Sequence, residues 1–152
     1  MPAIEDLRVE HVFTATPIVL SEDTSLGEAY ETLIGEGISG IPVTDKEGDL
    51  IGVISTSDLL VTLAPVFDSQ EETPDAAELR RLNEAPLSEY VQGPPLTCGE
   101  NTPLQEACQL MLRERVHRLV VVAADEIVGI ISSMDVVRAV ALAGEDEEDD
   151  DD

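Results

Sequence analysis

The sequence predicts an α/β protein built from two copies of one small unit, and three observations carry that prediction. Residues 51–58 (IGVISTSD) return as residues 128–135 (VGIISSMD), each an apolar strand that leads through Gly-x-x-Ser to an Asp three residues further on. Stripes of apolar residues with helical spacing occur in both halves, 78 residues apart. Val/Ile runs such as residues 119–122 suit strands that helices cover on both faces. Self-similarity across half of the chain indicates a duplicated fold unit.

Each unit is expected to run strand, helix, strand, turn, strand, helix. The first strands are predicted at residues 17–19 and 95–97, and the hairpin turns at residues 45–49 and 123–126, where the second copy is one residue shorter. The helical stripes are Leu26, Ala29, Tyr30, Leu33 and Ile34 in the first copy and Leu104, Ala107, Cys108, Met111 and Leu112 in the second.

The start of the helix in the second copy carries a predicted cap. Thr102 is expected at the N-cap, Pro103 at the first helical position and Gln105 as the partner in a capping box. Thr24 would take the same place in the first copy, where Gly27 leaves the box incomplete.

Segment boundaries follow from these patterns. The predicted segments are, in order, a lead at 1–6, a first repeat at 7–64, a linker at 65–86, a second repeat at 87–143 and a tail at 144–152. The linker is expected to be a loop with a short surface helix at 76–82. The last eight residues are all acidic, so the tail is expected to be disordered.

The chain carries a net charge of −25, with 33 acidic residues against eight basic ones. Removing the eight terminal acidic residues still leaves −17, so acidic residues are spread over the folded part. Because molar salt shortens the Debye length to about 3 Å and screens such repulsion, we expect a halophilic protein adapted to a salt-rich cytoplasm. The same charge argues against nucleic-acid binding. No apolar run is long enough to cross a bilayer and no signal pattern is present, so a soluble cytoplasmic protein is expected.

The sequence offers no candidate for catalysis or for metal binding. Cys98 and Cys108 are too few for a zinc site or a disulfide scaffold, and they are expected to be buried thiols. His11 and His117 stand beside no recognisable nucleophile motif, and no Gly-rich phosphate loop is present. We therefore expect a protein that is not an enzyme and requires no cofactor or metal.

The repeated Ser and Asp have two interpretations. Ser55 and Ser132 as N-caps, with Asp58 and Asp135 at the third helical position, would satisfy the amides at the start of each helix. The same geometry could bind a ligand, because a helix N-terminus offers N–H groups to an anion and a carboxylate can accept both hydroxyls of a ribose. The glycine three residues before each Ser would let a ligand or a neighbouring chain approach the strand closely. Capping and binding are compatible, and the residues alone leave both open.

Further motifs surround the repeated Ser and Asp in both halves. They are residues 9–14 (VEHVFT), 38–43 (ISGIPV), 87–91 (LSEYV) and 115–122 (RVHRLVVV). With these motifs in this order, the chain resembles a tandem pair of CBS domains (the cystathionine beta-synthase repeat, also called a Bateman module) over residues 7–64 and 87–143. The last motif is similar to the final repeat of the gamma subunits of AMP-activated kinase.

The resemblance implies a three-stranded sheet with two helices in each repeat. It also implies that the repeats pack about a pseudo-twofold axis and form clefts in which adenosine-containing ligands bind. In those clefts Asp58 and Asp135 would hold ribose hydroxyls, and Ser55 and Ser132 would contact ribose or phosphate. Backbone and apolar side chains would clasp the adenine at Thr16, Pro17, Ile18, Ile38, Ser39, Gly40, Ile41, Pro95, Leu96 and Val116.

The two halves differ where charge matters. The second has His117 and Arg118 just before a strand, where the first has Ser39 and Gly40. Two adjacent basic side chains favour binding of a phosphate. Arg138, on the helix that follows, would either assist them or face solvent.

We therefore expect a regulatory CBS pair, a homodimer as the family often forms, that binds AMP, ADP or ATP ahead of S-adenosylmethionine or NAD. Ligand binding would signal to an unidentified effector protein, as in energy sensing, with no nucleic acid or membrane as partner. The alternative is a structural protein-interaction module whose clefts are empty and whose linker and acidic tail dock a partner.

Overall fold

The computed structural model describes residues 3–15, 18–67, 76–91 and 95–149, and the chain divides into two compact units. Ile18–Pro95 form one of them, which we call the Asp58 unit. Met1–Pro17 and Leu96–Asp152 together form the other, the Asp135 unit. The first 17 residues thus belong with the second half of the chain.

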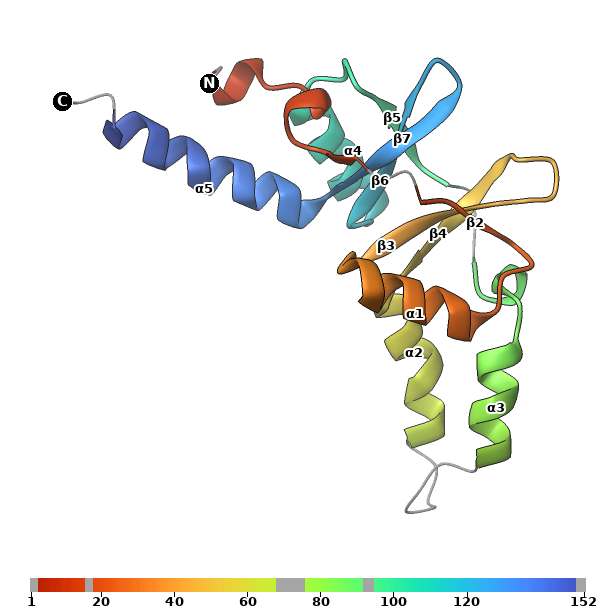
Figure 1. Cartoon of the computed structure of the whole chain (residues 1–152). Coiled ribbons are helices and arrows are strands. Elements are labelled where there is room, and N and C mark those ends of the chain that lie inside the picture. The colour runs from red at the N-terminus through yellow and green to blue at the C-terminus, as the bar shows by residue number, and fades with distance from the viewer. Residues whose placement is uncertain (1–2, 16–17, 68–75, 92–94, 150–152) are drawn as a thin grey trace. The chain divides into compact units, whose positions relative to one another are not determined.

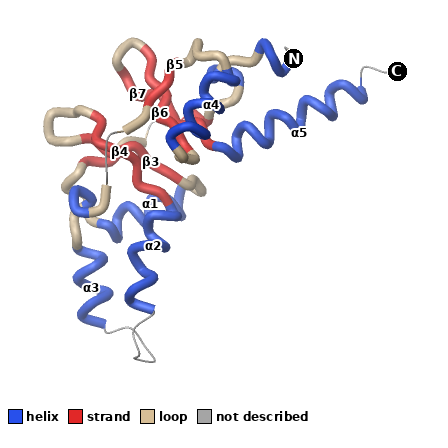
Figure 2. The backbone as a smooth tube through the Cα atoms, turned by 180° about the vertical axis from the view of Figure 1, so that it is seen from behind, coloured by secondary structure: helices blue, strands red, loops and turns tan. Residues whose placement is uncertain are grey.

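In the part that the structure describes, the Asp58 unit has a three-stranded sheet and three α-helices (Figures 1 and 2). Its elements are β2 (Leu20–Ser21), α1 (Leu26–Glu36), β3 (Gly40–Thr44), β4 (Leu50–Ser55), α2 (Thr56–Phe67), α3 (Ala76–Glu84) and the 3-10 helix η3 (Leu87–Glu89). The sheet order is β2-β3-β4, with β2 parallel and β4 antiparallel to β3. The first strand begins later than the predicted residues 17–19. α3 packs against α1, where the Asn83 backbone oxygen lies 3.1 Å from the position that a Cβ on Gly27 would take.

The Asp135 unit has a four-stranded sheet, one strand more than the sequence predicts. Its elements are the 3-10 helices η1 (Ile4–Asp6) and η2 (Val9–His11), then β1 (Thr14–Ala15), β5 (Thr97–Gly99), α4 (Leu104–Glu114), β6 (Arg118–Ala123), β7 (Glu126–Ser132) and α5 (Ser133–Asp149). The sheet order is β1-β7-β6-β5, and the additional strand is β1, which pairs antiparallel with β7. A Cβ on Gly129 would meet the Thr14 carbonyl oxygen and lie 2.8 Å from the Phe13 ring. Gly129 therefore admits a neighbouring segment of the chain, as predicted for the glycine before the Ser.

Each unit joins the main part of one sequence repeat to the opening residues of the other repeat. In the Asp135 unit, the Val9 N–H donates to the Thr102 carbonyl oxygen (2.9 Å) and the Leu104 N–H donates to the Leu7 carbonyl oxygen (2.8 Å). These bonds attach the opening residues of the first repeat to the start of α4, in the second repeat.

The Asp58 unit repeats this arrangement 78 residues later. The Leu87 N–H donates to the Thr24 carbonyl oxygen (2.9 Å) and the Leu26 N–H donates to the Ala85 carbonyl oxygen (2.8 Å). The residues at the opening of the second repeat are thus held at the start of α1, in the first repeat. The duplication extends to backbone hydrogen bonds between distant parts of the chain.

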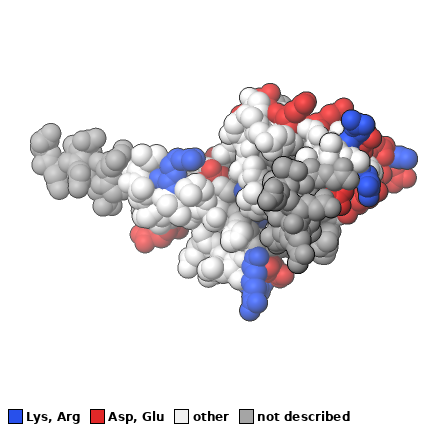
Figure 3. Space-filling model, turned by 90° about the horizontal axis from the view of Figure 1, so that it is seen from below, with Lys and Arg blue, Asp and Glu red and all other residues white. Residues whose placement is uncertain are grey.

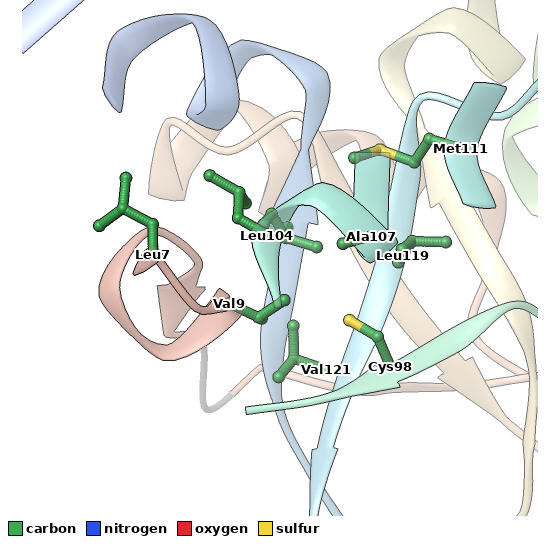
Figure 4. Packing of buried hydrophobic residues seen from close by; sticks show 9 residues of the cluster. Leu7, Val9, Cys98, Leu104, Ala107, Met111, Leu119 and Val121 are labelled. Atoms are coloured by element: carbon green, nitrogen blue, oxygen red, sulfur yellow. The ribbon is translucent and has the colours of Figure 1, made fainter. Parts of the chain in front are cut away.

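Both cores are aliphatic and combine helix, sheet and preceding segment. Figure 4 shows the Asp135 core, in which Leu7 and Val9 come from the N-terminal segment and the others from β5, α4, β6 and β7. Its buried members are Leu7, Val9, Cys98, Leu104, Ala107, Met111, Leu119, Val121 and Ile131. The Asp58 core contains Leu26, Ala29, Leu33, Ile41, Val43, Ile54, Leu59 and Leu87. The predicted helical stripes are narrower than expected, because Tyr30, Ile34 and Leu112 are exposed.

The predicted helix caps are wrong in detail. The N-cap of α1 is Ser25, whose hydroxyl accepts from the Glu28 N–H (3.2 Å). The N-cap of α4 is Pro103, which has no capping side chain, and the Thr102 hydroxyl instead accepts from the Gly99 N–H (3.0 Å). Thr102 therefore stabilises the turn after β5, which is the other common use of a hydroxyl residue beside a helix.

The helices α2, α3 and α5 end later than the sequence predicts. α3 includes the helix predicted at residues 76–82, and α2 continues to Phe67, beyond the predicted end of the first repeat. α5 continues to Asp149, through most of the tail for which disorder is predicted. Glutamate at 145, 147 and 148 favours a helix, as do the alanine and leucine residues at 139–143 just before the tail. Residues 150–152 lie outside the described residues.

Acidic side chains stand on several separate parts of the surface and not only at the C-terminal end (Figure 3). This distribution agrees with the charge that remains when the tail is left out. No helix among the described residues combines the length and apolar character needed to cross a membrane.

Candidate functional site

Ser55 and Asp58 form a reciprocal cap at the start of α2. The Ser55 Oγ accepts from the Asp58 N–H (3.3 Å), while Asp58 Oδ2 accepts from the Ser55 N–H and from the Ser55 hydroxyl (both 2.9 Å). The capping interpretation of this pair is confirmed. No described residue donates a hydrogen bond to the other carboxylate oxygen, Asp58 Oδ1, and the Asp58 side chain is exposed.

Ser132 and Asp135 form the equivalent cap at the start of α5. Asp135 Oδ2 accepts from the Ser132 N–H (2.9 Å), and the Ser132 Oγ accepts from the Asp135 N–H (3.2 Å). Here the second carboxylate oxygen is also engaged, because Oδ1 accepts from the Thr14 hydroxyl (3.2 Å) and lies 3.5 Å from an Arg138 guanidinium nitrogen. Asp135 is only 8% exposed. The Arg138 side chain, whose role the sequence leaves open, pairs with Asp135 while remaining 64% exposed.

The first helical N–H groups have partners within the protein. The Thr56 N–H donates to the Ser39 carbonyl oxygen (3.1 Å), and the Ser133 N–H donates to the His117 carbonyl oxygen (2.9 Å). Together with the caps, these bonds occupy amides that the binding interpretation assigns to an anion. A phosphate at either site would therefore depend on side chains for most of its contacts.

Strand register places the charge difference between the halves directly beside the caps. Gly40 on β3 is opposite Ser55 on β4, whereas Arg118 on β6 is opposite Ser132 on β7. The Nε atom of Arg118 is buried, and none of the described residues accepts a hydrogen bond from it. A buried donor without a partner costs free energy, so this nitrogen favours an added acceptor.

A surface hollow of about 290 Å³ adjoins Asp58 within its own unit. Its described lining residues are Val53, Asp58, Val61, Thr62, Glu89 and Tyr90. Glu89 and Tyr90 come from the opening of the second repeat, far in sequence from Asp58, so the sequence motif around Asp58 gave no sign of them. Thr14, the hydroxyl donor to Asp135, was likewise missed because it lies 121 residues away in the chain.

The other predicted site residues fall into two groups, one in each unit. Ser39 and His117 are exposed, and Pro95 is half-buried. Ile18 and Ile38 pack against the Asp58 core, and Leu96 and Val116 pack against the Asp135 core. Ile41 is fully buried, so its side chain belongs to the core and only its backbone could contact a ligand. Thr16 and Pro17 lie outside the described residues.

The cysteines and the acidic turn are structural features. Burial raises the pKa of the Cys98 thiol from 9.0 to about 11, so it is protonated at neutral pH, and burial also raises the pKa of Cys108. In the β3–β4 turn, one Asp45 carboxylate oxygen accepts from the Glu47 and Asp49 N–H groups (both 2.9 Å). The Glu47 and Asp49 carboxylates lie nearby, but the bonds of Asp45 are those of an Asx turn.

Comparison with known proteins decides the family. A model of the CBS domain matches residues 9–65 and 87–142. The chain belongs to the CBS domain family.

Relatives and solved structures agree with this family. CBS domain-containing protein CBSX1 of Arabidopsis thaliana is 32% identical in an alignment 136 positions long, which covers 80% of this chain and 58% of that protein. The chain thus spans less than two thirds of this relative's length. The crystal structure of CBSX2 in complex with AMP has a TM-score of 0.67 at 27% identity, covering 90% of this chain and 98% of that one. The CBS domain pair of protein MJ0100, in complex with 5′-methylthioadenosine and S-adenosyl-L-methionine, shares the fold, with a TM-score of 0.70 at 24% identity over 89% of this chain and 96% of that one.

Proposed function

We propose that this CBS pair is a regulatory protein that binds an adenosine-containing ligand, and that the Asp135 unit binds the phosphate of AMP, ADP or ATP. The observation that carries the proposal is the buried Nε of Arg118, which donates to none of the described residues; Arg118 itself stands opposite Ser132 in the sheet. A phosphate oxygen is a suitable acceptor for that donor. The AMP complex of CBSX2, which shares 27% of its sequence with this chain, supports the choice of ligand.

Each neighbouring side chain has a defined part in this proposal. Asp135 would accept the ribose hydroxyls, and Ser132 would contact ribose or phosphate. His117 is exposed beside Arg118 and would add a second donor. Because Asp135 Oδ1 already accepts from Thr14, a ribose hydroxyl must compete with that bond. Ligand binding would therefore loosen the contact between the N-terminal segment and α5.

Signalling would follow from that competition. A ligand changes a conformational equilibrium only through its different affinity for the two states. We infer a homodimer that transmits the change to an effector protein, in a salt-rich cytoplasm, and that uses nucleotide as a regulator without turning it over. Mass measurement by light scattering in molar KCl tests the dimer, and an assay for nucleotide hydrolysis tests the regulatory role.

Calorimetric titration of the full chain tests ligand binding. AMP, ADP and ATP are expected to bind in molar KCl more tightly than S-adenosylmethionine or NAD. Asp135→Asn should weaken AMP binding, whereas Asp125→Asn, in the exposed β6–β7 turn, should leave it unchanged. Absence of binding by all five ligands would contradict the proposal.

A structural interaction module is the second candidate. Both Asp residues already cap helices, and α2 and α5 expose large apolar side chains that a protein partner could cover, namely Leu60, Val61, Met134, Val137, Val140 and Leu142. This candidate predicts partner capture that is insensitive to nucleotide, with no shift in melting temperature on adding AMP. A nucleotide-dependent interaction would exclude it.

A further inference from the structure

We propose that the acidic end of α5, residues 145–149, docks against Arg115 of a second copy of the chain, in a symmetric, antiparallel pair of α5 helices. Arg115 is the first residue after α4. The inference rests on the proposed function, because it concerns the homodimer inferred there. It adds the contact that would orient the two copies and the residue that would determine it.

Arg115 has an unusual backbone conformation for its residue type. It ends α4 in the left-handed region (φ 57°, ψ 44°), where Gly is the usual residue. The equivalent residue at the end of α1 is Gly37 (φ 64°, ψ 34°). Both copies form the same turn, since the Ile38 and Val116 N–H groups each donate to a carbonyl oxygen near the end of the preceding helix (both 3.0 Å). The turn alone favours Gly, so the Arg side chain has a use outside the turn.

Arg115 lies in a basic turn on the surface, residues 115–118 (RVHR). The equivalent residues 37–40 of the first copy (GISG) contain no basic residue. Arg115 and His117 are exposed, and no described residue forms an ion pair with either side chain. On a chain with 33 acidic residues, an exposed positive turn is complementary to an acidic segment.

The acidic end of α5 has the converse local conflict. Every residue from 145 to 149 is Asp or Glu, and all of them lie in the last turns of the helix. The helix dipole is negative at this end, and like charges three or four residues apart repel. A positive charge placed beside the acidic end would therefore stabilise it.

The direction of α5 assigns this contact to a second copy. The helix starts beside the basic turn of its own chain, where the Ser133 N–H donates to the His117 carbonyl oxygen (2.9 Å). At a rise of about 1.5 Å per residue, Glu145 lies about 18 Å along the helix from Ser133. Figure 1 shows α5 leading away from the sheet of its own unit. The acidic end is therefore out of reach of the basic turn in the same chain.

The surface between the two charged regions is apolar. Met134, Val137 and Val140 are 61%, 59% and 48% exposed, and their spacing of three residues places them on one side of α5. A surface that is positive at one end, apolar in the middle and negative at the other is complementary to itself about a twofold axis. Antiparallel pairing joins each acidic end to a basic turn, whereas parallel pairing would bring like charges together.

Arg115→Gly separates association from folding. Because Gly suits the left-handed turn, the melting temperature in dilute solution should rise. The dissociation constant of the dimer, measured by sedimentation equilibrium, should nevertheless increase about threefold. Ala124→Gly is the matched control, since Ala124 also has a positive φ (49°) but lies in the turn at the far end of β7 from α5. It should raise the melting temperature and leave the dissociation constant unchanged.

Reversal of charge tests which surfaces meet. Arg115→Glu should weaken the dimer about tenfold, because attraction becomes repulsion at both symmetric contacts. The same weakening is expected when the acidic end carries Glu145→Lys, Glu147→Lys and Glu148→Lys. The matched control makes the same change of net charge on exposed residues of α1, with Glu28→Lys, Glu31→Lys and Glu36→Lys. It should not weaken the dimer.

Mixing the two reversed proteins is the decisive step. In a heterodimer, each basic turn or acidic end meets a partner of opposite charge again, so the mixture should associate about as tightly as the unsubstituted chain. All measurements use the lowest KCl concentration that retains the folded spectrum, because salt screens these contacts.

The outcomes separate this inference from the proposed function. If either reversal leaves the dimer unchanged, or if the mixture is as weak as the separate variants, the inference is overturned and the homodimer remains. If the unsubstituted chain is monomeric at every concentration, both the inference and the homodimer fail. Calorimetric binding of AMP tests the ligand part of the proposed function independently of either result.

Discussion

The Asp58 and Asp135 units share a backbone design and differ in what surrounds it. Both begin a helix with the same reciprocal Ser–Asp cap. In both, the carbonyl oxygen of the residue just before a strand accepts a hydrogen bond from the first helical N–H. Around Asp135 the carboxylate is buried and paired with a hydroxyl and a guanidinium, whereas Asp58 is exposed beside Glu89. The comparison teaches that the repeated motif specifies a helix start, and that residues outside the motif give each copy different charge and burial.

The β1 strand is the element that most distinguishes the Asp135 unit, and Gly129→Ala should have the largest effect. The new Cβ would meet the Thr14 carbonyl oxygen and the Phe13 ring, so β1 must shift. We expect a loss of about 3 kcal/mol in the free energy of unfolding, measured by denaturant titration.

Gly35→Ala is the matched control, because nothing lies within 4 Å of its Cβ position in α1. It should stabilise the protein by about 0.5–1 kcal/mol. If Gly129→Ala proved as harmless as Gly35→Ala, the close approach of β1 to β7 would be wrong.

The two caps should differ in their contribution to stability. Asp135→Ala removes the carboxylate that accepts from the Ser132 N–H and leaves Thr14 and Arg138 without their partner, so we expect a loss of about 2 kcal/mol in the free energy of unfolding. Asp58→Ala, at an exposed position, should cost about 1 kcal/mol. Asp135→Ala should also weaken AMP binding by about 1–3 kcal/mol. Equal losses of stability in the two variants would remove the distinction between the caps.

Thr14→Val separates stability from binding. The substitution removes the hydroxyl that donates to Asp135 Oδ1, so the free energy of unfolding should fall by about 1 kcal/mol. AMP binding should nevertheless become about fivefold tighter, because the ribose no longer competes with that hydroxyl. Weaker AMP binding in this variant would show that Thr14 and the ligand do not compete.

The last predicted effect is an alkaline loss of stability through Cys98. Burial raises the pKa of the folded-state thiol from 9.0 to about 11, so the protonated form is favoured by folding. That contribution is complete below pH 9 and is lost as the pH rises from 9 to about 11. Cys98→Ala should flatten the pH dependence in this window, and an unchanged slope would assign it to another group.

How much of this could be predicted from sequence depends on the distance between the interacting residues. The repeat, the hairpins and the Ser–Asp caps were predictable, because each is a local pattern of a few residues. The N-cap of α1 was displaced by one residue, since Thr24 and Ser25 are both suitable capping residues. The docking of residues 4–15 on the second repeat could not be predicted, because no local pattern records which distant surface a segment covers.

Around the Ser–Asp caps, too, neighbours close in sequence could be predicted and distant ones could not. The presence of Arg118 beside the second motif was readable, and the structure places it opposite Ser132. Thr14 donates to Asp135, and Glu89 lines the hollow beside Asp58. Both residues are far from the Ser–Asp motifs in sequence, so only the folded structure shows that they lie there.

Calorimetric titration of AMP into the full chain and into Arg118→Ala tests the central claim most directly. The variant removes the buried, unpartnered donor and leaves the Ser132–Asp135 cap intact. Arg113→Ala is the matched control, because its side chain is 70% exposed on α4. We predict AMP binding that Arg118→Ala weakens at least about tenfold, the loss of one charge-assisted hydrogen bond, and that Arg113→Ala leaves unchanged. AMP binding of equal strength in all three proteins, or in none, would contradict the account.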